Sequence, residues 1–230
     1  AGLADVAGEV GLDIVVAGSL GEPRITGSAQ LSGGAAALTG IGVSIEDIEV
    51  DVRGDGGAVL VLQGSARAGG PLDIAGEITP LAQGGPAGFI RFRGERLDAV
   101  RLTDRFVQAS PDITLRLADG RLGVDGTVLI PKADIVVREL PQSAVSPSAD
   151  TVVADRDTPA QPGPGSLILD GEIDVRFGDD VRLRGFGLDT RLAGGLKLSQ
   201  SDSGEPQGFG VVRLVEGRIG AYGRALDIER

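Results

Sequence analysis

The amino-acid sequence predicts an all-β fold. Over most of the chain apolar residues alternate with polar or small ones at period two, which is typical of strands with one buried and one solvated face. Turn-forming stretches such as Gly54–Gly57 and Asp119-Gly120 separate these runs, as hairpin turns do. Helical periodicity is weak, and its best case is a short helix over residues 96–107.

The alternating runs give the expected strands in chain order. They fall at residues 12–16, 41–52, 72–78, 113–117, 122–130, 167–177, 181–183, 188–192, 196–198, 212–214, 219–221 and 226–228. The clearest run, 167–177, has apolar residues such as Val175 on one face and charged residues such as Asp174 on the other. A strand of this kind needs cover on one side only.

Residues 140–165 differ from the rest of the chain. This stretch is mostly polar and holds five of the prolines, so it predicts a long mobile loop with one short strand around Val152 and Val153. We expect residues 1–230 to form a single β domain around that loop. Because the chain contains no methionine, we interpret it as a piece of a longer protein. No apolar run reaches the roughly 20 residues that a membrane-spanning helix needs.

The charge balance excludes two classes of partner. The net charge is -11, with 33 acidic and 22 basic residues. Nucleic acids and anionic lipid headgroups are both bound through clustered Lys and Arg, so neither is expected as a ligand. Several arginines occupy the polar faces of the predicted strands among acidic residues, which favours cross-strand ion pairs. These arginines are Arg91, Arg93, Arg116, Arg176, Arg182 and Arg184.

Candidates for chemistry are few. The chain has no His and no Cys, and therefore lacks the commonest bases, nucleophiles and metal ligands. A Ser–Lys pair would need Lys132 or Lys197, and Lys197 lies in an alternating run where a solvent-facing lysine is the ordinary interpretation. The acidic pairs at 155/157 and 179/180 lack the spacing of a calcium loop. We therefore expect no enzyme activity, no metal and no cofactor.

The apolar faces are the remaining candidates for function. Two arrangements fit them: a β-sandwich, in which the faces bury one another, or a bent open sheet, in which they line a trough suited to acyl chains. The alternation by itself favours the sandwich. If a trough exists, its candidate lining residues are Leu72, Ile74, Leu115, Leu122, Val124, Val128, Ile130, Leu169, Ile173, Val175, Phe177 and Leu183.

One stretch resembles a known family. Residues 110–135, SPDITLRLADGRLGVDGTVLIPKADI, are similar to the turn, strand pair and strand end of the TamB C-terminal domain. Stretches at 18–34, 41–52, 145–153, 177–198 and 217–230 are similar to that family in order and spacing. The family's membrane helix, most of its body and its final strands are absent from this sequence.

The resemblance implies a β-taco, which is a bent sheet that encloses an apolar groove. It also implies a periplasmic location, a full-length protein anchored in the bacterial inner membrane, and partnership with TamA, an outer-membrane barrel of the BamA type. The implied roles are phospholipid movement between the membranes, with acyl chains as ligands, and assembly of outer-membrane proteins. No catalytic residue comes with it. A lipid conduit, a strand-binding scaffold for outer-membrane proteins and a structural β-sandwich module are the three hypotheses that follow.

Overall fold

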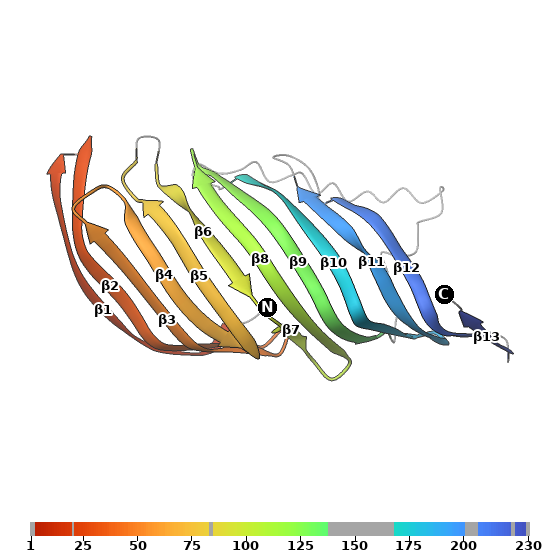
Figure 1. Cartoon of the computed structure of the whole chain (residues 1–230). Coiled ribbons are helices and arrows are strands. Elements are labelled where there is room, and N and C mark those ends of the chain that lie inside the picture. Colours follow the sequence, from red (N-terminus) through yellow and green to blue (C-terminus); the bar gives the residue numbers. More distant parts are fainter. Residues whose placement is uncertain are drawn as a thin grey trace, which may run out of the picture.

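Every regular element among the residues that the computed structural model describes is a β-strand. The structure describes residues 3–19, 21–82, 85–137, 168–200, 207–221 and 224–228, and Figure 1 shows their strands side by side in one layer. The strands are β1 (Leu3–Ser19), β2 (Glu22–Leu38), β3 (Val43–Asp55), β4 (Leu60–Ala68), β5 (Gly70–Thr79), β6 (Ala87–Gly94), β7 (Leu97–Arg101), β8 (Arg105–Ala118), β9 (Arg121–Val136), β10 (Ile168–Gly185), β11 (Leu188–Gln200), β12 (Gln207–Ala221) and β13 (Arg224–Ile228).

The strands follow one another across the sheet almost in chain order. The order is β1-β2-β3-β4-β5-β6-β8-β9-β10-β11-β12-β13. The short strand β7 pairs with the same edge of β8 as β6 does, further along that strand. All neighbours are antiparallel except β9 and β10, which are parallel. The chain between these two strands includes residues 138–167, so the predicted proline-rich loop and its short strand lie outside the described residues.

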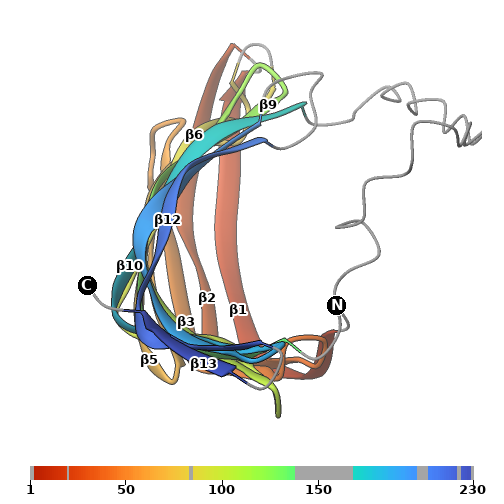
Figure 2. The same cartoon turned by 90° about the vertical axis from the view of Figure 1, so that its right-hand side faces the viewer.

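The single layer decides between the two predicted arrangements. All 13 strands belong to one open sheet, whereas a sandwich needs two sheets facing each other. Figure 2 shows that this sheet is strongly bent and leaves one side open. The prediction of an all-β, bent open sheet is therefore confirmed, and the β-sandwich alternative is wrong for the described strands.

The helix predicted over residues 96–107 is also wrong. This segment contains β7 and the start of β8, which pair in an antiparallel hairpin. The apolar residues that suggested a helical face come from two different strands, with Val100 on β7 and Phe106 on β8. The β7 strand continues the line of β6 along β8 after a break at Arg96, whose φ of 49° turns the chain. The backbone N–H of Arg96 donates a hydrogen bond of 2.9 Å to the Ser110 hydroxyl.

The bend follows a line of β-bulges across the sheet. Register shifts interrupt the pairing of β1 with β2, β2 with β3, β3 with β4, and β11 with β12. At each shift one residue has a left-handed conformation: Asp5 (φ 50°), Gly33 (φ 58°), Asp47 (φ 51°) and Glu216 (φ 52°). A bulge bends its strand and increases the local twist, so bulges in successive strands fold the layer along one crease.

Small buried side chains lie along this crease. Among the described residues only seven apolar side chains are buried, and four of them are alanines: Ala66, Ala68, Ala109 and Ala133. Val181, which is 1% exposed, pairs with Ala133 across the parallel strands. Side chains crowd on the inner side of a sharp bend, so small residues allow the crease to close. Burial at the crease therefore identifies the inner face of the sheet.

Candidate functional site

The strand register places apolar residues in rows across the inner face. Paired residues on adjacent strands point to the same side of a sheet. One row joins β5 to β11 through successive pairs: Ile74, Phe92, Ile113, Gly126, Ile173 and Leu198. The same row extends the other way through Gly64, Val50, Leu31 and Val10 on β4 to β1. No residue in this row is polar, although it crosses ten strands.

Eleven of the twelve predicted trough residues have described side chains, and all eleven occupy one face in this register. On β9, Val124 pairs with Leu115 of β8, and Val128 pairs with Val175 of β10. Ile130 pairs with Phe177, and beyond the bulge Leu183 pairs with Ile135. Leu169 pairs through its backbone with Leu122, but its side chain lies outside the described residues. The structure thus places the eleven described members of the set together on the inner face.

These side chains are half-buried rather than buried. Each of the eleven described members of the set has intermediate exposure, and none lies in a closed core. On β4 the contrast between faces is clear, because Leu60 and Leu62 are half-buried while Val61, between them, is 45% exposed. An inner face of this kind is partly shielded by its own curvature and still open to a ligand.

The sequence-based set omitted several residues of the same face. Ile78, Ile90, Phe92, Ile113, Leu117, Leu196 and Leu198 share the rows of the predicted residues. The period-two alternation of the sequence also included these residues. The register between strands, which places them beside the predicted residues, could not be obtained from the sequence.

Polar side chains on the described part of the inner face include Thr190, Gln200 and Arg105, which pairs with Ile135 at the start of β8. Thr190 lies at the crease, is 1% exposed, and its hydroxyl donates to the carbonyl of Arg191 at 3.3 Å. Gln200 pairs with Gly171 at the end of β11, in the row that also contains Val124. The Thr190 hydroxyl has a hydrogen-bond acceptor inside the fold, whereas Gln200 is the last residue of β11. Polar groups on this face are therefore found at its margin and at its crease.

Two apolar hollows lie on the inner face. One, of about 240 Å³, lies over β9, β10 and β11 and is walled by Val124, Ile173 and Leu198. The other, of about 150 Å³, lies over β5 to β9 and includes Ile90 and Leu122 in its lining. Both have almost wholly apolar linings. Such surfaces offer a ligand dispersion contacts and removal from water, with few groups to hydrogen-bond it.

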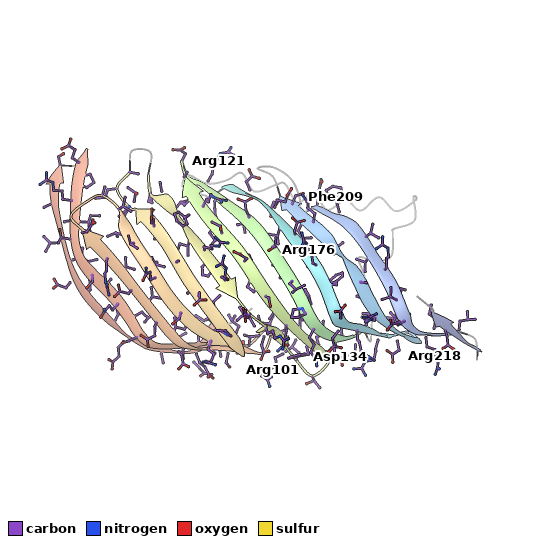
Figure 3. All side chains as sticks on the ribbon, viewed as in Figure 1. Arg101, Arg121, Asp134, Arg176, Phe209 and Arg218 are labelled. Atoms are coloured by element: carbon purple, nitrogen blue, oxygen red, sulfur yellow. The ribbon has the colours of Figure 1, made fainter. Side chains whose placement is uncertain are left out.

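The outer face carries the charges. Arg91 forms a bidentate ion pair with Asp112, with an Nε–Oδ1 distance of 2.7 Å. The Nζ of Lys197 lies 2.7 Å from Oε1 of Glu172. Figure 3 shows side chains along the whole sheet, with Arg176 in the middle and Asp134 near the lower margin. Asp134 pairs with Arg184 across the parallel strands. The predicted cross-strand ion pairs are therefore present for Arg91, Arg93, Arg116 and Arg184.

These pairs alter the protonation equilibria of their members. The hydrogen bond from Arg91 lowers the pKa of Asp112 below its ordinary value, and Arg93 adds to the effect. The hydrogen bond to Glu172 raises the pKa of Lys197, so this lysine is held in its charged form. A charged, paired lysine on the outer face fits the structural role predicted for it. In the described residues no three potential metal-ligating side chains cluster, and no helix long and apolar enough to cross a membrane occurs.

The fold and the site together define a class of protein. It is an open, bent β-sheet whose inner face is largely apolar and whose outer face carries paired charges. A closed sandwich or barrel would bury its apolar stripes, while this architecture leaves them accessible along the length of the sheet.

The chain belongs to the TamB C-terminal domain family, whose model matches residues 58–230. It is also similar to the translocation and assembly module subunit TamB of Haemophilus influenzae, with 33% identity over 132 residues. That similarity covers 53% of this chain and 10% of the relative, so the chain spans a small part of the relative's length. No solved structure matches the chain.

The family match supports the resemblance found in the sequence. The most specific stretch, residues 110–135, lies within the matched range, as do the stretches at 177–198 and 217–230. The stretches at 18–34 and 41–52 precede that range. Family membership is thus carried by the part of the sheet from β4 onward.

Proposed function

We propose that this domain is a segment of a periplasmic lipid conduit. Its apolar inner face would bind the acyl chains of phospholipids and support their transport between the inner and outer membranes. The observation that carries the proposal is the apolar row that crosses ten strands without a polar residue, at intermediate or greater exposure. Exposed apolar surfaces of that extent are typical of sites that bind proteins, membranes or ligands.

The energetics favour acyl chains over other ligands. Each CH₂ group that leaves water for an apolar surface contributes about 0.8 kcal/mol. The inner face offers few hydrogen-bonding side chains, so polar ligands would lose their hydration without compensation. The paired charges of the outer face keep the walls of the trough soluble. We expect no catalysis, because the proposed task needs only binding and release.

The proposal extends to location and partners. Membership of the TamB family favours a periplasmic domain within a longer protein anchored in the inner membrane. The curated relative is named as a subunit of the translocation and assembly module, which favours a TamA-like outer-membrane barrel as partner. Both statements concern the full-length protein, of which the domain would form part of the path.

A matched pair of substitutions on β9 tests the conduit. Val124→Asp places a charge on the inner face, and Leu129→Asp places the same charge on the outer face, where Leu129 is 44% exposed. In the full-length protein we expect Val124→Asp to lower the amount of co-purified phospholipid severalfold, while Leu129→Asp leaves it unchanged. Val175→Asp on β10 provides a second inner-face test. Equal phospholipid content in all variants would refute the proposal.

A second function is favoured by the free strand edges. β1 and β12 expose many apolar side chains, including Leu12 at 72% and Phe209 at 59%, and among the described residues β13 pairs with residues 217–221 of β12 alone. A free edge can accept an additional strand by backbone hydrogen bonding. The domain would then act as a scaffold for outer-membrane protein strands. Photo-crosslinkers at Phe209 that capture lipid and never an outer-membrane protein would contradict it.

A further inference from the structure

One arginine on the outer face connects three strands at the crease. Arg191 lies on β11, and its Nη2 donates a hydrogen bond of 2.8 Å to Oε1 of Glu216 on β12. Its Nη1 donates to the backbone oxygen of Asp179 on β10 at 3.1 Å. The Arg191 side chain is 22% exposed, against 45% for Arg184, which also pairs across strands. Arg191 is thus held between its two neighbouring strands.

Both contacts are made where the strand pairing is interrupted. On β10, residues 177–181 lie opposite residues 192–194 of β11, so β10 has more residues than its partner over this interval. Asp179 is in the middle of that interval. Glu216 lies in the register shift between β11 and β12, and it has a left-handed φ of 52°. Arg191 therefore binds one residue in the interruption on each side of β11.

The residue before Arg191 holds the same place from the inner face. Thr190 is 1% exposed, and its hydroxyl lies 3.3 Å from the carbonyl oxygen of Arg191 and 3.5 Å from that of Val215. Val215 is the neighbour of Glu216 in the register shift. The bulge of β12 is thus fixed by one side chain on each face of the sheet.

The setting of Arg191 is unfavourable in two other respects. Arg182 lies directly opposite it on β10, and like charges in such a position destabilise a sheet. Its Nε is buried and has no hydrogen-bond acceptor among the described residues, which is a further cost. An arginine that only kept the outer face soluble would extend into water. The contacts with Glu216 and Asp179 offset these costs, and they leave Arg191 little freedom to bind a ligand.

Outer-face side chains also bind the backbone at two other interruptions of the sheet. The N–H of Gly33, in the bulge of β2, donates to the Glu49 carboxylate of β3 at 2.9 Å. The N–H of Arg96, at the break between β6 and β7, donates to the Ser110 hydroxyl of β8 at 2.9 Å. Each of these side chains joins two segments, whereas Arg191 joins three strands. It is therefore the residue on which the crease between β10 and β12 depends most.

We propose that Arg191 is a positioning residue that sets the angle of the crease in β10, β11 and β12, and with it the opening of the trough there. A bulge bends its strand, so the angle is fixed only while the extra residues stay in place. When the guanidinium is lost, the extra residues are free to shift along β10 and β12, and the strands flatten. The inference goes beyond the conduit, because it concerns the shape of the sheet whether or not the trough binds lipid.

A distance measured across the crease tests the proposal. Spin labels are attached to the full-length protein through Phe209→Cys, on β12 near the upper margin in Figure 3, and Phe186→Cys, in the turn between β10 and β11. Both side chains are exposed, so the labels displace no packed residue. Double electron–electron resonance gives the distribution of distances between the labels. We expect a narrow distribution with Arg191 intact, and a broader one extending to longer distances in Arg191→Gln.

Arg218→Gln is the matched control. Arg218 lies 3.0 Å from Asp227 on the same face, but this pair is exposed and joins β12 to β13 on one side of the crease. It should leave the distance distribution unchanged, with circular dichroism unchanged in both variants. An unaltered distribution in Arg191→Gln, or equal broadening in Arg218→Gln, would overturn the proposal.

A milder variant keeps the test decisive if Arg191→Gln does not fold. Glu216→Gln removes the charge that binds Nη2 and leaves the bond to Asp179 in place. We expect it to broaden the distribution less than Arg191→Gln does, but more than Arg218→Gln. A folded Glu216→Gln variant with the unaltered distribution would contradict a role for this contact in setting the crease.

Discussion

At the scale of single residues, the alternation of apolar and polar side chains is the property that the structure uses most. It was sufficient to assign eleven described trough residues to one face, because adjacent positions on a strand point to opposite sides. Glycines on the same face were less easily interpreted from sequence. Gly171 keeps period with Leu169 and Ile173, but only the structure shows what its missing side chain does.

Gly171 allows close approach of the parallel strands β9 and β10. A Cβ at this position would lie 2.2 Å from the backbone oxygen of Val124. We expect Gly171→Ala to reduce the free energy of unfolding by about 1–3 kcal/mol, because one strand must shift. Gly11→Ala on β1 is the control, since a Cβ there meets nothing within 4 Å. Thermal unfolding measures both, and equal melting temperatures would contradict this account.

The Asp112 carboxylate makes stability depend on pH. Hydrogen bonding from Arg91 lowers its pKa in the folded protein below the ordinary value of 3.8. The deprotonated form therefore stabilises the fold above that value, and this contribution is lost as the pH falls through the lowered pKa. We expect Asp112→Asn to melt below the wild-type protein at neutral pH and the difference to shrink in acid.

A charge-matched variant controls for general acid effects. Asp73, on β5, forms no ion pair in the described part of the chain. Asp73→Asn removes the same charge from β5 and is measured over the same pH series as the reference for the change in net charge. An Asp112→Asn offset from wild type that does not change with pH would show that the Arg91–Asp112 pair contributes nothing to folding, as happens for many exposed pairs.

At the scale of elements, the strands could be predicted from the sequence, but the β-bulges and the break between β7 and β8 could not. The sequence indicated most strands because each carries several alternating residues. The sequence-based assignment was wrong for residues 96–107, which contain the end of one strand, a turn and the start of the next. Few residues alternate there, and the spacing of the apolar residues resembles that of a helix. The bulges were invisible for a related reason. A single extra residue shifts the alternation by one position, and Asp, Glu or Gly at that position resembles an ordinary outer-face residue.

The bulge at Asp47 tests the origin of the crease. Asp47 has a φ of 51°, a conformation that costs a β-branched residue about 1–2 kcal/mol. We expect Asp47→Val to lower the free energy of unfolding by that amount and Asp47→Gly to leave it unchanged or raise it. The exposed contact with Arg67, at 3.7 Å, accounts for little of either result. Chemical denaturation measures the difference, and a fully stable Asp47→Val variant would mean that β3 does not need the bulge.

At the scale of the whole molecule, the arrangement of the sheet could not be obtained from the alternation. Stripes of Leu, Ile and Val predict burial equally well in a sandwich and in a trough, and by pattern they favoured the sandwich. The line of bulges bends one sheet instead, so the stripes face an open space. The resemblance to the TamB family predicted this outcome, because it carried information on the fold that single strands lack.

The central claim is that the inner face, and only the inner face, contacts acyl chains. The chain contains no cysteine, so single cysteines can be introduced along β10 at residues 172–177 and labelled with a photoreactive group in the full-length protein. Our account predicts phospholipid adducts at 173, 175 and 177 and none at 172, 174 and 176. Adducts at both sets of positions, or at neither, would contradict it.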